Sequence, residues 1–398
     1  MKSSFKITIG ISLLALGMVA CEKILPGGPE DNELLDGPMA DLTVEQQILF
    51  LKGDEAFGEI YTIEKGLGPT FVATSCSSCH TGDGKGHPNR SLIRFGQSDL
   101  TGNKYLHLGG PQLQHRAIPG YEPEELPAGA PKAKLLAPAT VGLGLLDAVS
   151  DATLIALSDP MDQDNDGVSG VPAWTFVPDY VQLRPEAIEK DGKYISRFGK
   201  KAAAYNILHQ VSKALNQDIG ITSLYEPIDP YSGVEIDPEI ETVKIHHLVS
   251  YLQTVKAPTQ RNGDAPEVLA GEEIFTSIGC ASCHMPTLTT GSSPIGVLNN
   301  VTFHPYTDLL LHDMGPGFDD GYTEGAAERT EWRTPPLWGL GLVEDSQGGE
   351  YYLLHDGRAR SIEEAILEHG GEASNAKGAF SSLSDEEKGQ LMAFLESL

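Results

Sequence analysis

The sequence predicts a mainly α-helical protein built from two related domains. Three observations support this prediction: a cysteine and histidine motif that occurs twice, a short pattern that precedes each copy, and an amphipathic helix that closes each half. The chain has 398 residues, which suits two or three domains, and its hydrophobic content of 40% is enough for buried cores. We place the domains at residues 42–257 and 258–398, and we expect long loops and extra helices to enlarge the first.

Residues 1–20 have the composition of a secretory signal peptide. Lys2 and Lys6 precede an apolar run that ends in Met18-Val19-Ala20-Cys21, and this run is too short to span a bilayer comfortably. The pattern resembles a bacterial lipoprotein signal, in which the cysteine is acylated and begins the mature chain. An ordinary secretory signal that happens to contain Cys21 is the alternative. Either way we expect export to the cell envelope, and acylation would anchor the protein to a membrane, facing the periplasm or the cell surface.

Residues 21–41 are rich in glycine, proline and acidic side chains, which predicts a flexible tether between the lipid and the first domain. A helical pattern then begins near Leu42-Thr43-Val44-Glu45. The whole chain carries a formal net charge of −28. Such a surface repels nucleic acid, so we expect a docking partner to present a basic or neutral patch.

The other four cysteines fall in two copies of the motif C-x-x-C-H. The copies are Cys76-Ser77-Ser78-Cys79-His80 and Cys280-Ala281-Ser282-Cys283-His284. This spacing places two thiols on one face of a helical turn, where they can form thioethers with a haem, and the adjacent histidine becomes the proximal iron ligand. A thioredoxin-like dithiol or a four-cysteine zinc site would leave both histidines unexplained. The sequence therefore predicts two covalent haems c.

Each haem motif lies within the same order of elements. Related patterns precede the two motifs, Gly53-Asp54-Glu55-Ala56-Phe57 and Gly271-Glu272-Glu273-Ile274-Phe275. Amphipathic helices expected at 243–255 and 384–398 close the halves, and Val249-Ser250-Tyr251-Leu252 in the first is similar to Met392-Ala393-Phe394-Leu395 in the second. Helix, haem motif, loops and closing helix is the order of cytochrome c domains. We therefore expect two cytochrome c-like domains.

Several further stretches carry a resemblance to a known family. They are Arg197-Phe198-Gly199-Lys200-Lys201-Ala202, Asp218-Ile219-Gly220-Ile221-Thr222, the segment 308–317, Trp332-Arg333-Thr334-Pro335-Pro336-Leu337 and His355-Asp356-Gly357-Arg358-Ala359. They look like those of the bacterial dihaem oxidoreductases grouped as peroxidases or thiol oxidoreductases, distant relatives of the dihaem cytochrome c peroxidases and of the dihaem enzyme that matures methylamine dehydrogenase. The resemblance covers nearly all of residues 42–398. It implies two haems close enough to exchange electrons.

The sixth ligands of the two irons decide between an enzyme and an electron carrier. Reducing hydrogen peroxide to water needs two electrons, so a two-haem enzyme can store one at a closed iron and react at an iron that opens its sixth position. We expect such a peroxidase, supplied by a small redox donor or a cytochrome. A non-catalytic electron-transfer lipoprotein that feeds a partner redox complex is the alternative. An enzyme that oxidises a sulfur compound is a third, but its usual cysteine ligand is missing because every cysteine is otherwise assigned.

Met314 is the favoured sixth ligand of the second haem. Methionine raises the reduction potential, and the Gly-Pro-rich flank of Met314 suits a rigid ligand loop. His312 and His355 are the alternatives. The true peroxidases can carry a methionine just before their His-Asp-Gly, where this chain has Leu354.

Three histidines in loop-like stretches are candidates for the first haem: His87, His107 and His115. His115 also precedes Pro119 and Glu125, and the related enzymes line their peroxide pocket with a polar residue, a proline and a glutamate at similar spacing. The resemblance therefore implies that His115 and Glu125 are catalytic, with the glutamate moving protons between the peroxide oxygens. A solvated acidic loop is the other interpretation of Glu125.

Two groups of charged residues point to further ligands. Asp162, Asp164 and Asp166, followed by a glycine, form the opening of a calcium loop. The closing glutamate of an EF-hand is missing, so we expect either a calcium loop of another kind or a solvated acidic turn. Related dihaem peroxidases hold a structural calcium, which favours the first. Arg197 and Arg333 would suit haem propionates, with surface pairing as the alternative.

Overall fold

The computed structural model describes residues 32, 34–96, 98–99, 102–103, 105 and 110–398. The predicted signal peptide, Cys21 and His107 lie outside the described residues. Contacts place Leu35–Leu398 in one compact unit that contains both haem motifs. Helix accounts for 34% of the structure and strand for 13%, which confirms the mainly α prediction, whereas the boundary at residue 257 stays a prediction. None of the helices in the described part is long and apolar enough to cross a membrane.

Two helices begin with the same capping signal. Thr43 precedes α2 (Val44–Gly58), and Ser384 precedes α11 (Asp385–Ser397). In each case the hydroxyl accepts a hydrogen bond from the backbone N–H of the third helical residue, whose side chain accepts one from the backbone N–H of the capping residue. Local sequence therefore fixes where these two helices start.

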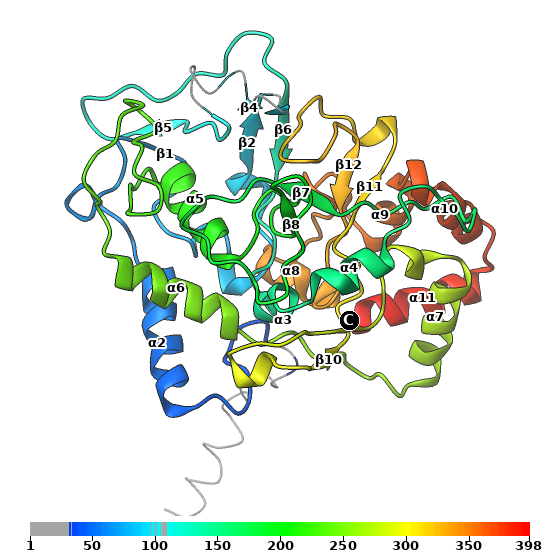
Figure 1. Cartoon of the computed structure of the whole chain (residues 1–398). Coiled ribbons are helices and arrows are strands. Elements are labelled where there is room, and N and C mark those ends of the chain that lie inside the picture. The colour runs from blue at the N-terminus through cyan, green and yellow to red at the C-terminus, as the bar shows by residue number, and fades with distance from the viewer. Residues whose placement is uncertain (1–31, 33, 97, 100–101, 104, 106–109) are drawn as a thin grey trace, which may run out of the picture. The chain divides into compact units, whose positions relative to one another are not determined.

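A pair of crossing helices organises each half (Figure 1). In the first half α2 packs against α6 (Thr242–Thr254), and in the second α7 (Pro266–Ser277) packs against α11. Gly53 lies at the first crossing and Gly271 at the second. A Cβ added to Gly53 or Gly271 would stand 2.2 Å or 2.1 Å, respectively, from a backbone oxygen of the partner helix. The glycine that the two sequence patterns share is therefore the point of closest approach in both pairs.

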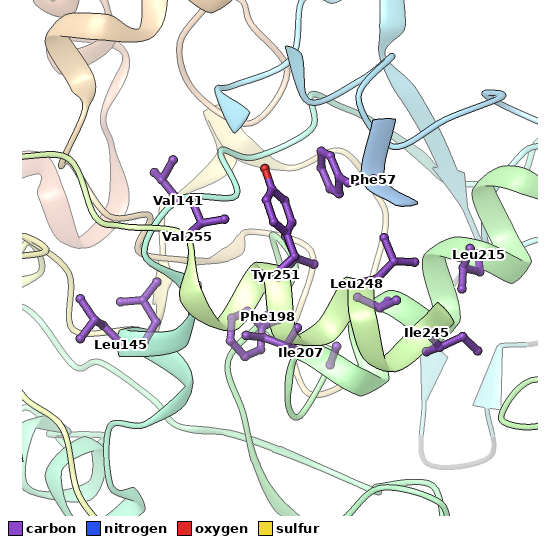
Figure 2. Close-up of a cluster of buried hydrophobic side chains, with 14 of the residues drawn as sticks. Phe57, Val141, Leu145, Phe198, Ile207, Leu215, Ile245, Leu248, Tyr251 and Val255 are labelled. Atoms are coloured by element: carbon purple, nitrogen blue, oxygen red, sulfur yellow. The ribbon is translucent and has the colours of Figure 1, made fainter. Parts of the chain in front are cut away.

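An aromatic contact follows each crossing. The ring centroids of Phe57 and Tyr251 are 5.3 Å apart, and those of Phe275 and Phe394 are also 5.3 Å apart. Figure 2 shows Tyr251 and Leu248 projecting from α6, with Tyr251 beside Phe57. The sequence similarity between the halves thus reflects the same packing of a first and a closing helix.

Additional elements surround these helix pairs. The other helices are α3 (Leu143–Asp147), α4 (Asp151–Leu157), α5 (Ile207–Ile219), α8 (Val343–Ser346), α9 (Ile362–Glu368) and α10 (Ser374–Ser381). The strands form antiparallel pairs: β1 (Thr70–Phe71) with β5 (Arg116–Ala117), β2 (Leu92–Phe95) with β6 (Lys132–Leu135), β3 (Ser98–Asp99) with β4 (Gly102–Asn103), β7 (Ala173–Thr175) with β8 (Tyr194–Ser196), β9 (Leu288–Thr289) with β10 (Thr302–Phe303), and β11 (Leu311–Asp313) with β12 (Glu331–Arg333). Most of these elements lie in the first half.

The largest hydrophobic cluster surrounds α6 and extends into the second half. Ile245, Leu248 and Tyr251 from α6 belong to it, together with Leu288 and Trp338 from beyond residue 257. A second cluster surrounds α7, α9 and α11. Because the first cluster includes residues of both halves, burial of apolar surface holds the halves together.

Replacing either crossing glycine should destabilise the protein. We expect Gly53→Ala and Gly271→Ala each to cost about 1–3 kcal/mol of unfolding free energy, since the atoms that the new Cβ meets belong to rigid backbone. Gly58→Ala and Gly389→Ala are matched controls, because a Cβ there meets nothing within 4 Å and alanine favours helix by up to about 1 kcal/mol. Thermal unfolding of the four variants measures the difference, and equal melting temperatures would contradict the close crossing.

Candidate functional site

Both C-x-x-C-H motifs line a single cavity of about 640 Å³. Its motif residues are Cys76, Cys79, His80, Cys280, Cys283 and His284. None of these four cysteines forms a disulfide in the described structure. Most of the remaining lining is apolar, with a small number of charged side chains, and this composition is typical of cofactor sites.

The two motif histidines are held in the same way. Nδ1 of His80 donates to the carbonyl oxygen of Pro138 at 2.8 Å, and Nδ1 of His284 donates to that of Tyr306 at 3.0 Å. A proton fixed on Nδ1 leaves Nε2 as the ligand atom, which is how metal-binding histidines are usually oriented. Burial lowers the pKa of each imidazole to about 4, so both are neutral at neutral pH. Neutral imidazole is the form that binds a metal.

The arrangement of the cysteines fits two haems better than one zinc ion. Each motif forms a single turn, in which the backbone N–H of the histidine donates to the carbonyl oxygen of the first cysteine at 3.0 Å. Two thiols and an imidazole of one turn thus lie along the same wall of the cavity, as haem attachment requires. Within the described part of the chain, the one group of potential ligands close enough to share an ion is acidic and contains no cysteine.

A third histidine, His369, lines the cavity in the same manner, and it was not among the predicted ligands. It follows α9, and its Nδ1 donates to the carbonyl oxygen of Ala365 at 2.6 Å, which leaves Nε2 free to bind a metal. Repulsion from His369 adds to burial in lowering the pKa of His284, which indicates that the two histidines lie near each other. The pair Gly370-Gly371, which follows His369, is the feature of the sequence that could have pointed to this histidine. A Cβ on Gly371 would stand 2.0 Å from the carbonyl oxygen of Asp313, so glycine is needed where this turn meets the neighbouring loop.

His312 is a charged structural residue in this arrangement. Its Nε2 lies 2.8 Å from a carboxylate oxygen of Asp308, and its Nδ1 lies 2.7 Å from one of Glu372. Burial alone would lower the pKa of His312, but the hydrogen bonds to these carboxylates and to Cys283 raise it to about 12. With both nitrogens occupied, His312 has no free atom for iron. Glu372 also accepts hydrogen bonds from Ser169, which ties the acidic loop to the second half.

Met314 and His355 both line the cavity and remain candidate ligands. Met314 packs against a cluster that includes Phe318 and Trp332. Nε2 of His355 lies 3.0 Å from a carboxylate oxygen of Asp320, and its ring stacks on Trp332 with centroids 3.9 Å apart. Its Nδ1 is buried and has no hydrogen-bond partner in the described structure. The geometry thus leaves one ring nitrogen of His355 unused.

The predicted catalytic residues of the first haem do not line the cavity. His115 and Glu125 are both exposed. Their neighbours Gln114 and Glu124 point inward instead, and the backbone N–H of Gln114 donates to Glu124 at 2.7 Å. Gln114 and Glu124 hold the loop together and do not line the cavity either, so the catalytic role of His115 and Glu125 stays a prediction.

His87 also lies away from the large cavity. Its Nδ1 accepts a hydrogen bond from the backbone N–H of Asn89 at 3.1 Å, and its ring contacts Tyr352 at the edge of a small surface pocket. The histidine therefore caps a short turn. Neither His87 nor His115 lines the cavity, and their assignment as ligands of the first haem stays a prediction.

A group of polar side chains that was not predicted from the sequence, called the polar wall below, faces the first motif. Gln210, Lys213, Gln217 and Asp218 of α5 line the cavity at helical spacing. Glu324 pairs with Arg94 and lies 3.8 Å from the Lys213 ammonium. Burial would raise the pKa of Glu324, but these two cations lower it, whereas burial raises the pKa of Asp218 to about 6. The sequence did not predict this wall because α5, Arg94 and Glu324 are distant from one another in the chain.

The comparisons with known proteins identify the family. The chain matches the model described as "Di-haem oxidoreductase, putative peroxidase" over residues 133–398. The chain belongs to this dihaem oxidoreductase family. This confirms the resemblance found in the sequence, and it makes haem the expected cofactor. The matched region contains the second haem motif and α5, while the first motif precedes it.

Two solved structures are also similar to the chain. A chain of hydrazine synthase from Kuenenia stuttgartiensis is 13% identical, with a TM-score of 0.40 and coverage of 94% of this chain and 98% of that chain. A MauG-like protein associated with microbial copper homeostasis is 15% identical, with a TM-score of 0.39 and coverage of 94% and 95%. A search of curated proteins finds no match.

Proposed function

We propose that this dihaem oxidoreductase is a c-type peroxidase that reduces hydrogen peroxide with electrons from an external donor. The main support is the shared cavity, where two C-x-x-C-H motifs each present a neutral imidazole. Cys76, Cys79, Cys280 and Cys283 would hold the two haems through thioethers. Bound haem supplies redox-active iron at both motifs, so that two electrons are available for one reduction.

The cellular setting of this proposal comes from the sequence. Acylation of Cys21 would anchor the protein to a membrane, with the haem domains facing the periplasm or the cell surface. The net charge of −28 favours a small redox protein or cytochrome with a basic or neutral docking face as the donor, and it disfavours nucleic acid.

The two haem sites would have different tasks. We propose His369 as the sixth ligand of the second haem, because its Nε2 is free and it is oriented like His80 and His284. Met314 and His355 are the competing ligands. The backbone of Met314 lies against the glycine pair that follows His369, but its side chain packs with Phe318 and Trp332. An iron with two histidine ligands stores an electron and does not react with peroxide.

The first haem would then be the reacting one. Peroxide reduction consumes two protons, and the polar wall beside the first motif can supply them. Asp218, with a pKa of about 6, is partly protonated near neutral pH, and Lys213 with Glu324 forms a second exchangeable pair. The sequence alone did not predict this group of titratable side chains beside the first motif. The wall therefore supports an open iron at the first site.

Electron paramagnetic resonance of the holoprotein tests the peroxidase proposal. Spectra are recorded at low temperature, fully oxidised and half-reduced, before and after about one equivalent of hydrogen peroxide. We expect a high-spin ferric signal that peroxide abolishes, because an open iron reacts and a closed one does not. Only low-spin signals, unchanged by peroxide in both states, would instead identify a non-catalytic electron-transfer lipoprotein. Mass spectrometry of the denatured chain checks that two haems remain covalently attached.

Substitution of the proposed ligand tests its assignment separately. His369→Ala should convert one low-spin haem to high-spin, since the second iron loses its sixth ligand. Met314→Leu should leave the spin state unchanged, and His87→Ala is a control that removes a histidine outside the cavity. Optical and paramagnetic resonance spectra of the three ferric variants give the comparison. If Met314→Leu produced the high-spin haem and His369→Ala did not, Met314 would be the ligand.

We also propose calcium at the acidic loop. Ligand oxygens of Asp159, Asp162 and Asp164 lie within 4.8 Å of one another, and this arrangement favours a cation held by oxygen. Asp166, predicted as the third ligand, does not belong to this group of three carboxylates. Asp159 would take its place in the site.

Thermal unfolding with and without calcium tests this site. A ligand that binds only the folded state raises the melting temperature, so we expect calcium to stabilise the protein and a chelator to reverse the effect. The double variant Asp162→Asn, Asp164→Asn should lose the response, whereas Asp166→Asn should keep it. An unchanged melting temperature at millimolar calcium would indicate a solvated acidic turn.

A further inference from the structure

Three cations gather at the wall of the haem cavity between the two motifs. Lys85 follows the first motif by five residues, Lys200 lies in the loop after β8, and Arg333 ends β12; all three side chains line the cavity. The backbone N–H of Arg333 donates to the carbonyl oxygen of Lys200 at 3.0 Å, so these two residues are direct neighbours. Elements from both halves therefore bring the three charges together.

These cations have no carboxylate partner among the described side chains. The Lys85 ammonium donates to the carbonyl oxygen of Leu354 at 2.8 Å, and the Arg333 guanidinium donates to those of Gly199 and Thr334, each at 3.0 Å. The Lys200 ammonium makes no hydrogen bond or ion pair within the described structure, and the nearby carboxylate of Asp356 is paired with an arginine 2.8 Å away. Each of the three is thus held only by backbone, or not at all.

Three other cations that line the cavity are paired, and a fourth, the partly buried Lys377 of α10, has no ion pair in the described structure. Arg94 and Lys213 share Glu324, and Arg197 pairs with Asp151. Arg197, predicted to bind a propionate, also donates to the carbonyl oxygen of Val149, so its guanidinium is used within the protein. Unpaired charges are costly away from water unless an anion joins them. The contrast indicates that Lys85, Lys200 and Arg333 are available to bind an anionic ligand.

Their electrostatic influence supports the same conclusion. Burial and then repulsion from Arg333 lower the pKa of Lys200 to about 8, and burial and then repulsion from Lys200 lower that of Lys85. Lys200 also adds to burial in lowering the pKa of His80, so it lies within reach of the first motif. Arg333 interacts instead with Asp308, the partner of His312 in the second half. Arg333 also pairs with Leu311 of β11, next to His312, whose Nδ1 lies 3.5 Å from the Cys283 sulfur, so Lys200 and Arg333 together extend from the first motif toward the second.

We propose that Lys85, Lys200 and Arg333 form one anion site that receives propionates from both haems. This inference rests on the proposed dihaem function and adds a shared control of the two reduction potentials. Propionates are carboxylates, which accept charge-assisted hydrogen bonds from lysine and bidentate ones from arginine. A cation beside a haem favours the reduced iron, because reduction removes one positive charge. Charge at Lys200 thus raises both potentials together.

Redox titration of the holoprotein tests this site. We expect Lys200→Gln to lower the midpoint potential of both haems by about 59 mV. A shift of this size is a tenfold change in each one-electron equilibrium constant. Lys200→Arg should retain both potentials, since it keeps the charge and changes only the shape of the donor. Lys213→Gln removes a cation of the first site only and should shift one haem, and Lys134→Gln, on the exposed face of β6, should shift neither.

Two results would overturn the shared site. If Lys200→Gln changed the midpoint potential of only one haem, or of neither, the Lys200 charge would not act on both haems. Equal shifts in Lys200→Gln and Lys200→Arg would show that the structure, and not the charge, was changed. These outcomes are independent of the peroxidase proposal, because a protein with two haems that ignores peroxide can still be titrated, and an active peroxidase can still ignore the substitution.

Discussion

The close approach of two helices in each half is the constraint on which the haem sites depend. Gly53 and Gly271 allow a backbone oxygen of the closing helix to come within reach of the first helix, where any side chain would separate them. The same contact brings an aromatic side chain of the first helix toward the motif: the ring centroids of Phe57 and His80 are 6.0 Å apart. Without this spacing, the motif and its closing helix would not share one cavity wall.

The closing helix of the first half also fixes the loop that follows the motif. The hydroxyl of Tyr251 donates to the buried carboxylate of Asp83 at 2.6 Å, and the hydroxyl of Thr140 donates to the same carboxylate at 2.9 Å. Thr140 follows Pro138, whose carbonyl oxygen accepts the Nδ1 proton of His80. One continuous set of contacts thus leads from the helix crossing to the orientation of the ligand histidine, which is why a residue as distant as Gly53 bears on the iron site.

Local signals made the frame of the structure predictable. The two C-x-x-C-H motifs and the capping boxes each act within a few residues, and the glycine patterns are visible because they repeat before both motifs; the structure retains all of them. Features that depend on distant segments were missed. Gln114 and His115 are adjacent, and Gln114 points inward because its side chain bonds to Thr70 of β1 and to backbone carbonyl oxygens of α5. Likewise Arg94 meets Glu324, and Lys200 meets Arg333, across more than a hundred residues.

The enlarged first half explains why two sites with the same frame would differ in chemistry. The polar side chains beside the first motif come from α5 and from Arg94, which belong to the segment that a minimal cytochrome c domain lacks. The second half has no counterpart of α5 among its described elements, and its cavity wall is built from α9, its following histidine and the buried His312 with its two carboxylates. The first motif therefore faces the side chains of α5, whereas the second faces the free imidazole nitrogen of His369 and a His312 whose two nitrogens are both paired. The peroxidase proposed above needs protons at one iron and only electrons at the other, and the assignment of the first site as the reacting one rests on this difference between the two walls.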